Sequence, residues 1–337
     1  MQGYLERIRR GESLTKVEAK AVCTLILDEN TLNDEIVSCL KLLHQKKESA
    51  QEISGFRDAI LETTETFPDQ GMNLIDVCGT GGDGAQTFNV STGVALLIAS
   101  LGVKVAKHGN RGVSSKSGSS DVLKSLGIQS DVTAAESNSS LNDFGISFLF
   151  APGFYPVLAR LAAIRKSIPH PTLFNVLGPL LNPAPVTHQL MGVYSPSLLE
   201  TSANVLRERG VKRAFIVHGS DGLDELTLTG PSHVVSLQNG DLKNFTLNPS
   251  EFGLSLATAE SVKGGGPEVN AQILMQIFAG ERSAKRDLLV MNAAAALVVA
   301  EVSHNFKDAS LMVCHALDTG RTLKLIERLT AKTKVVT

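Results

Sequence analysis

From residue 74 onward, short apolar segments alternate with stretches that have the pattern of helices. Leu74–Cys78 and Val103–Ala106 are predicted to be buried strands, with a helix from about residue 92 to residue 101 between them. Further strands are predicted at Ser147–Phe150, His188–Tyr194 and Arg213–Val217. Strands that alternate with helices usually form a mostly parallel sheet with helices on both faces. The sequence therefore predicts an α/β fold.

The first 65 residues have a different pattern, without a clear strand. Apolar residues recur at helical spacing, and the segments Ser13–Lys16 and Thr31–Glu35 supply N-cap residues. A segment that contains Pro68 and Gly71 follows. We therefore expect a small α-helical domain over residues 1–65, completed by part of 165–185, and a large α/β domain over 70–337. The end of the chain, from about Pro267, is again predicted to be helical.

Composition and charge exclude several classes of protein. The 337 residues have a formal net charge of -2, which argues against a general affinity for nucleic acid. No apolar run approaches the roughly 20 residues of a membrane span, and the N-terminus lacks the apolar core of a signal peptide. The four cysteines lie far apart without a CxxC pair, so neither a zinc site nor a disulfide framework is expected. We expect a cytoplasmic protein.

A glycine-rich loop, Asp76-Val-Cys-Gly-Thr-Gly-Gly-Asp-Gly84, follows the first predicted strand and leads into Thr87–Thr92. A strand, a glycine turn and a helix start bring backbone N–H groups together at the positive end of a helix dipole, which favours an anion. Ser91 and Thr92 are expected to cap the helix and to donate to a phosphate. A plain turn is the alternative without a ligand.

Two other phosphate motifs fit this loop less well. Its glycines match the dinucleotide fingerprint, but that motif needs an acid about 20 residues later, and residues 84–120 contain no Asp or Glu. A P-loop would end in Gly-Lys-Ser/Thr, which is absent. The loop is therefore interpreted as a phosphate or pyrophosphate site of another kind.

The same acid-free stretch is rich in cations and leads into a second polar loop, Ser114–Ser120. Its basic residues are Lys104, Lys107, His108, Arg111 and Lys116. The segment Lys107–Arg111 is expected to follow the second strand, at the carboxyl edge of the sheet where open α/β sheets bind ligands. Two such loops with several cations indicate a ligand with phosphates at two ends.

An acidic turn follows the strand that ends near Val217. It contains Asp221, Asp224 and Glu225. Carboxylate oxygens suit Mg²⁺, which commonly takes one or two carboxylates together with substrate phosphates. An ordinary acidic turn is the alternative, but an anion site on a neighbouring loop favours the metal.

Together these segments resemble the anthranilate phosphoribosyltransferase family over nearly the whole chain. The matching motifs are Gly79-Thr-Gly-Gly-Asp83, Asn89-Val-Ser-Thr92, Lys107-His-Gly-Asn-Arg111, Gly118-Ser119 with Asp121-Val-Leu, Phe174-Asn with Leu177-Gly-Pro-Leu180 and Asn182-Pro183, and Gly222-Leu-Asp-Glu225. The resemblance implies a nucleoside phosphorylase/phosphoribosyltransferase-like fold, a homodimer and a role in tryptophan biosynthesis. It implies transfer of the phosphoribosyl group of phosphoribosyl pyrophosphate (PRPP) to anthranilate with Mg²⁺.

The resemblance also implies roles for individual residues. The residues implied to bind PRPP are Gly79, Gly82, Asp83, Thr87, Asn89, Ser91, Thr92, Lys107 and Ser119. Those implied to bind the acceptor are His108, Asn110, Tyr155, Arg165 and Gly178. Ser91, Asp224 and Glu225 are implied to hold Mg²⁺. No residue is assigned as an acid or base, and Lys107 and Arg165 are expected to position the substrates.

Two positions depart from the family pattern. Tyr155 stands where the family usually has His, and Pro171 stands where it usually has Arg. Both belong to the acceptor half, so transfer to a different aromatic amine is one alternative. A nucleoside phosphorylase and a nucleic-acid-binding paralogue without the activity are the others, and the net charge of -2 and the acidic pair argue against the last.

Overall fold

The computed structural model describes residues 1–64, 67–69, 71–112, 117–130 and 133–336. The chain begins with four helices: α1 (Gln2–Arg9), α2 (Lys16–Leu27), α3 (Asn33–Lys46) and α4 (Ala50–Leu61). Thr15 and Ser49 begin α2 and α4 with capping boxes, in which Glu18 and Glu52 bond back to the cap residue. The expected helical N-terminus is therefore present. Thr15, from the first expected cap segment, caps α2, whereas α3 begins after Leu32 without a side-chain cap.

Seven strands form one sheet. They are β1 (Ile75–Gly79), β2 (Val105–Gly109), β3 (Ile146–Phe150), β4 (His188–Gly192), β5 (Arg213–Gly219), β6 (Ser232–Gln238) and β7 (Asp241–Leu247). Their order is β3-β2-β1-β4-β5-β6-β7. The first five in that order are parallel, and β6 and β7 continue the sheet as antiparallel strands. The predicted α/β fold with a mostly parallel sheet is confirmed.

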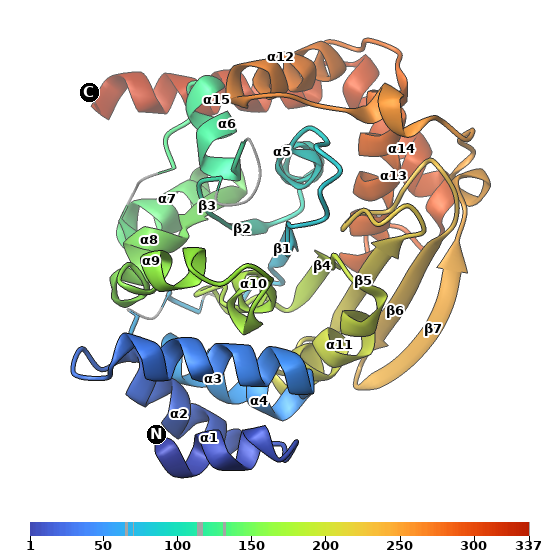
Figure 1. Cartoon of the computed structure of the whole chain (residues 1–337). Coiled ribbons are helices and arrows are strands. Elements are labelled where there is room, and N and C mark those ends of the chain that lie inside the picture. The colour runs from blue at the N-terminus through green and yellow to red at the C-terminus, as the bar shows by residue number, and fades with distance from the viewer. Residues whose placement is uncertain (65–66, 70, 113–116, 131–132, 337) are drawn as a thin grey trace.

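The other helices cover both faces of this sheet (Figure 1). They are α5 (Val90–Ser100), α6 (Ser119–Ser125), α7 (Ala134–Phe144), α8 (Ala151–Phe154), α9 (Leu161–Lys166), α10 (Leu173–Leu177), α11 (Leu199–Glu208), α12 (Pro267–Phe278), α13 (Ala284–Val299), α14 (Phe306–Asp318) and α15 (Arg321–Val336). One hydrophobic cluster joins α5 to α12–α15. A second cluster joins α1–α4 to α9–α11 and the opposite face of the sheet. The N-terminal helices thus share their core with later segments, and the expected domain limits stay a prediction.

Two local expectations were wrong, and one pair of strands was not predicted. Strand β2 begins at Val105 and runs to Gly109, because Lys107 and His108 are polar yet buried within the sheet. Helix α5 begins at Val90 after the N-cap Asn89, so Ser91 and Thr92 lie in its first turn and do not cap it. The sequence analysis also missed the β6–β7 hairpin, whose turn residue Asn239 has a φ of 50°. Among the described residues, no helix is both long and apolar enough to cross a membrane.

Candidate active site

The carboxyl ends of four parallel strands bring the predicted loops together. Strands β1 and β4 end in register at Gly79 and Gly192, and β2 and β5 end beside them at Gly109 and Gly219. The glycine loop, the segment after β2 and the acidic turn therefore lie along one edge. Residues 113–116, including the predicted cation Lys116, lie outside the described part of the chain.

Asp224 reaches across this edge to the glycine loop. Its Oδ2 accepts a hydrogen bond of 2.7 Å from the backbone N–H of Gly81. A Cβ atom on Gly79 would overlap the Asp224 carboxylate, and one on Gly192 would overlap the backbone carbonyl of Asp224. The two strand ends must therefore be glycine for Asp224 to approach. The sequence motif identified Gly79, but the need for Gly192 is visible only in the packing.

Lys107 is a buried cation beneath the start of α5. Its side chain is only 3% exposed, and Nζ donates to the carbonyl oxygen of Val77 at 2.7 Å and to Ser91 Oγ at 3.3 Å. An ammonium held this deeply cannot rotate away into water. Lys107 and Ser91 thus form one end of the site, beside the first turn of α5.

The carboxyl groups of Asp224 and Glu225 are both buried in this same region. Burial, followed by the negative charge of Asp83, raises the pKa of Asp224 to about 7. Burial, followed by the charge of Asp224, raises the pKa of Glu225 well above its usual range. Two buried carboxylates without enough positive charge are costly to ionise, so the protein alone does not balance this pair.

Asp221, the third acid of the turn, has a different task. Its Oδ2 accepts hydrogen bonds of 2.7 Å from the hydroxyls of Thr227 and Thr229. It therefore stabilises the turn that contains Asp224 and Glu225, and it is not itself a candidate metal ligand.

The glycine loop is anchored by a segment to which the sequence analysis assigned no role. Asn270 Nδ2 donates to Asn89 Oδ1 at 2.9 Å, and Ser117 Oγ donates to the same oxygen at 3.0 Å. Thr87 forms a β-bridge with Lys263. The tract from Lys263 to Asn270 thus holds Thr87 and Asn89 in place.

The second loop packs against the end of β2. Ser119 Oγ donates to the carbonyl oxygen of Asn110 at 3.2 Å, and a Cβ on Gly109 would overlap that hydroxyl. Asp121 Oδ2 accepts from the N–H groups of Gly112 and Gly118, each at 2.9 Å. Ser119 and Asn110, which were assigned to different substrates, are therefore direct neighbours.

His108 lies at the centre of the predicted acceptor half. Its Nδ1 is 3.1 Å from the carbonyl oxygen of Gly178. A carbonyl only accepts, so Nδ1 carries the proton and Nε2 has a free lone pair. Burial lowers the pKa of His108 to about 4, so the ring is neutral at physiological pH. Nε2 is buried and has no partner within the described part of the protein.

Tyr155 lies behind His108. Its side chain is 2% exposed, and its hydroxyl donates to the carbonyl oxygen of Leu181 at 2.5 Å. The rings of Tyr155 and His108 meet edge to face, with centroids 6.0 Å apart and planes at 88°. The hydroxyl is therefore already engaged within the protein, and the ring supports the imidazole of His108.

Arg165 has no carboxylate partner among the residues that the structure describes. Its guanidinium lies over the ring of Phe174, 5.5 Å from the centroid, and burial lowers its pKa. Nearby, His170 in the altered segment before Pro171 stacks on His44 of α3 at 4.1 Å. A half-buried, unpaired guanidinium is suited to receive a carboxylate.

Comparisons with known proteins agree with this arrangement. Family models described as "Glycosyl transferase family, helical bundle domain" and "Glycosyl transferase family, a/b domain" match residues 2–64 and 71–323. An anthranilate phosphoribosyltransferase of Bacillus cereus is 41% identical over 96% of this chain and 95% of its own length. The chain belongs to the anthranilate phosphoribosyltransferase family.

Solved structures of this family share the fold. The enzyme of Thermus thermophilus superposes with a TM-score of 0.91 at 34% identity, covering 98% of this chain and 99% of its own. The enzyme of Saccharomyces cerevisiae in complex with PRPP and Mg superposes with a TM-score of 0.90 at 28% identity, covering 99% and 98%. The resemblance seen in the sequence motifs is thus confirmed.

The donor set of this family member fits a magnesium ion. Within the described residues, no group of three or more His, Cys, Asp or Glu side chains is arranged as a metal site. Asp224 and Glu225 supply buried carboxylates, and Ser91 Oγ supplies a hydroxyl close to Lys107. These oxygen ligands are too few to complete the coordination of Mg²⁺, and substrate phosphate oxygens would supply the rest. Mg²⁺ sites in proteins are usually arranged in this way.

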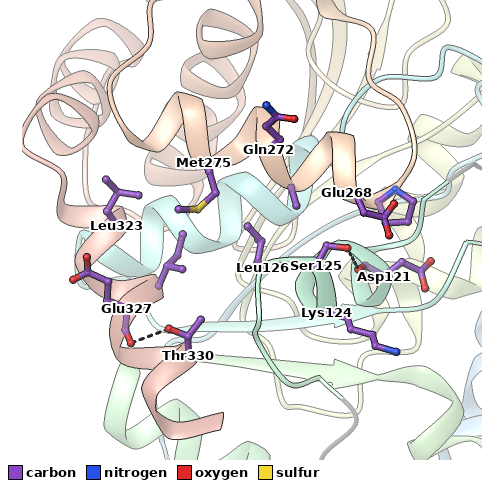
Figure 2. Close-up of a pocket in the computed structure, with 13 residues that line it drawn as sticks. Asp121, Lys124, Ser125, Leu126, Glu268, Gln272, Met275, Leu323, Glu327 and Thr330 are labelled. Atoms are coloured by element: carbon purple, nitrogen blue, oxygen red, sulfur yellow. Dashed lines mark hydrogen bonds between the residues drawn. The ribbon is translucent and has the colours of Figure 1, made fainter. Parts of the chain in front are cut away.

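A large cavity of the described part of the chain lies away from this site. It encloses about 1000 Å³ between α6, α12 and α15, and Figure 2 shows Met275 and Leu323 among its lining residues. Asp121, Glu268 and Glu327 line it with a single cation, Lys124. Three acids against one lysine disfavour phosphate, so the charge of this cavity does not suit PRPP.

Proposed function

We propose that this chain transfers the phosphoribosyl group of PRPP to the amine of anthranilate, releasing pyrophosphate in a Mg²⁺-dependent reaction. The observation that carries the proposal is the buried pair Asp224 and Glu225, held against the glycine loop beside Lys107. A site with excess buried negative charge and an adjacent phosphate loop suits a metal-bound pyrophosphate. The relatives support it, since the yeast enzyme was solved with PRPP and Mg and also with 4-fluoroanthranilate.

The pyrophosphate end would be held by the loop after β1 and the first turn of α5. Backbone and hydroxyl donors would come from Gly79, Gly82 and Thr87 in the loop. Further donors would come from Asn89, Ser91 and Thr92 at the start of the helix. The Mg²⁺ that Ser91, Asp224 and Glu225 would hold neutralises charge on the departing pyrophosphate. Lys107 contributes a fixed positive charge to the same group, and a preorganised charge of this kind usually dominates such catalysis.

The remaining PRPP groups would lie between the two loops. Asp83 is near the expected ribose position, and Ser119 at the start of α6 is near the expected 5′-phosphate. These positions follow from the family resemblance and from the common edge on which both loops lie.

The acceptor would lie against His108, Asn110 and Gly178. Arg165 would pair with its carboxylate, which accounts for a guanidinium that has no carboxylate of its own. The neutral His108 presents the Nε2 lone pair as an acceptor for an N–H of the amine. Tyr155 would act by holding the His108 ring.

In the reaction, the lone pair of the amine forms a bond to C1′ of the ribose. The bond between C1′ and the pyrophosphate oxygen breaks, and pyrophosphate leaves with the electron pair. The amine, neutral at pH 7, gives up one proton to solvent after attack. Orientation of the two substrates is therefore expected to matter more than proton transfer.

We further expect a cytoplasmic homodimer that does not bind nucleic acid. A different aromatic amine is the second candidate acceptor, and Tyr155 and Pro171 in the acceptor half are the observations that favour it.

The test is an acceptor panel with PRPP and Mg²⁺. Initial rates of pyrophosphate release would be compared for anthranilate, 3-aminobenzoate and 4-aminobenzoate. The proposal predicts turnover of anthranilate and little of the isomers, because only anthranilate carries its carboxylate next to the amine. Turnover of an isomer in preference to anthranilate would contradict anthranilate as the acceptor. Phosphoribosyl transfer to an aromatic amine would still hold as the type of reaction.

A further inference from the structure

A basic cavity lies at the amino ends of the parallel strands, opposite the active site. It encloses about 350 Å³ between α15, the turn before β2 and the turn before β3. Ser100 and Gly102 end α5 on one side, and Phe144 and Gly145 end α7 on the other. It shares no residue with the site described above.

Four cations line this cavity against a single acid. They are Lys104, Arg321, Lys324 and Arg328, and the acid is Asp143. Asp143 is already neutralised, since its Oδ2 accepts from Lys332 at 3.1 Å and from Ser139 at 3.0 Å. In a chain with a net charge of -2, this concentration of positive charge is local and unbalanced.

Three of the cations are free to bind a ligand. Lys104, Arg321 and Lys324 form no ion pair or side-chain hydrogen bond within the described part of the chain. Arg321 and Lys324 are three residues apart on α15, so helical geometry places them on one face. Lys104 faces them from the turn before β2.

Arg328 is fixed in place at the same cavity. Its Nη2 donates to the carbonyl oxygen of Asp143 at 2.9 Å, and its guanidinium lies 5.2 Å from the centre of the Phe144 ring. The start of α15 adds to this field. Arg321 is the first residue of this helix, and the amino end of a helix carries partial positive charge.

We infer that this cavity binds a small anion with two or more linked phosphates, such as free pyrophosphate or the diphosphate of a nucleotide. Several free cations around one concave space match several phosphate charges, whereas a single carboxylate would leave most of them unpaired. The volume admits a diphosphate with its water but no duplex nucleic acid. The site is independent of the transferase reaction.

The experiment is a calorimetric titration of the full chain with sodium pyrophosphate in buffer free of divalent cations. Without a divalent cation, the active site lacks the Mg²⁺ that Ser91, Asp224 and Glu225 are proposed to hold for pyrophosphate, so binding that is lost in the test variant reports the basic cavity. The test variant is Arg321→Gln with Lys324→Gln, and the control is Lys41→Gln with Lys307→Gln, which removes two exposed lysines from other helices. Equal melting temperatures would establish that both variants fold.

We expect one pyrophosphate per chain for the wild type and the control, and binding at least about tenfold weaker for the test variant. The KM for PRPP with Mg²⁺ should be the same in all three, which separates this site from the active site. A parallel titration with adenosine diphosphate distinguishes the two sources of the diphosphate. No binding by the wild type, or equal binding by the test variant, would overturn the inference.

Discussion

Gly192 is the position at which a single methyl group should disable the site. It ends β4, and a Cβ there would overlap the backbone carbonyl of Asp224. Backbone cannot rotate aside as a side chain can, so Gly192→Ala must displace the acidic turn by about 1 Å or more. Overpacking of this kind costs about 1–3 kcal/mol of the free energy of unfolding. A displacement of about 1 Å in a positioned catalytic group costs about a hundredfold in rate.

The assay measures kcat with saturating PRPP, anthranilate and Mg²⁺, together with the thermal unfolding midpoint. Gly3→Ala is the matched control, because a Cβ on Gly3 of α1 meets no atom within 4 Å. We expect an unchanged rate for Gly3→Ala and about a hundredfold loss for Gly192→Ala in protein that remains folded. A Gly192→Ala enzyme with the wild-type rate would refute the claim that Asp224 must lie against this strand end.

The other predictions concern the roles of single side chains. Arg165→Ala should raise the KM for anthranilate about tenfold to a hundredfold and leave that for PRPP nearly unchanged; equal losses for both substrates would contradict its placement. Tyr155→Phe removes the bond to Leu181 and should lower kcat/KM for anthranilate several-fold without changing PRPP affinity, whereas an effect on PRPP alone would oppose a role behind His108. Asp224→Asn combined with Glu225→Gln should abolish Mg²⁺-dependent turnover. Retained activity would contradict the assignment of these two carboxylates as Mg²⁺ ligands. The raised pKa of Asp224, about 7 in the metal-free protein, means that the folded state holds a proton that the unfolded state has released. Its contribution should therefore lower the free energy of unfolding as the pH rises from about 4 to about 7. The depressed pKa of His108 has the opposite effect on the free energy of unfolding between about pH 4 and pH 6.5. The measured quantity is therefore the difference in free energy of unfolding between wild type and Asp224→Asn. This difference should change between about pH 4 and pH 7. A difference that is independent of pH would contradict the buried, protonated carboxyl.

Much of the fold follows from local sequence patterns. Apolar runs identified the five parallel strands, because strands that are buried on both faces need no alternation. The β6–β7 hairpin was missed although Asn239-Gly240 is a strong turn signal, since its strands carry mixed polar residues at an exposed edge. The end of β2 was missed because Lys107 and His108 are polar residues, although both are buried within the sheet.

The candidate site was predictable where it depends on residue type and order. The glycine loop, Lys107 and the acidic pair could be recognised because each lies in a short contiguous motif. The need for Gly192, the anchoring by Asn270 and the engagement of the Tyr155 hydroxyl could not, because each depends on contacts between distant segments. Asn270 and Asn89, for example, are 181 residues apart.

The most direct test of the account is anthranilate fluorescence in the presence of PRPP, with Mg²⁺ and then with excess EDTA. The account predicts loss of fluorescence with Mg²⁺, one pyrophosphate released for each anthranilate consumed, and arrest by EDTA. Consumption that continues unchanged in EDTA would contradict the metal role of Asp224 and Glu225. No consumption by folded protein with both substrates and Mg²⁺ present would contradict the proposed transfer to anthranilate.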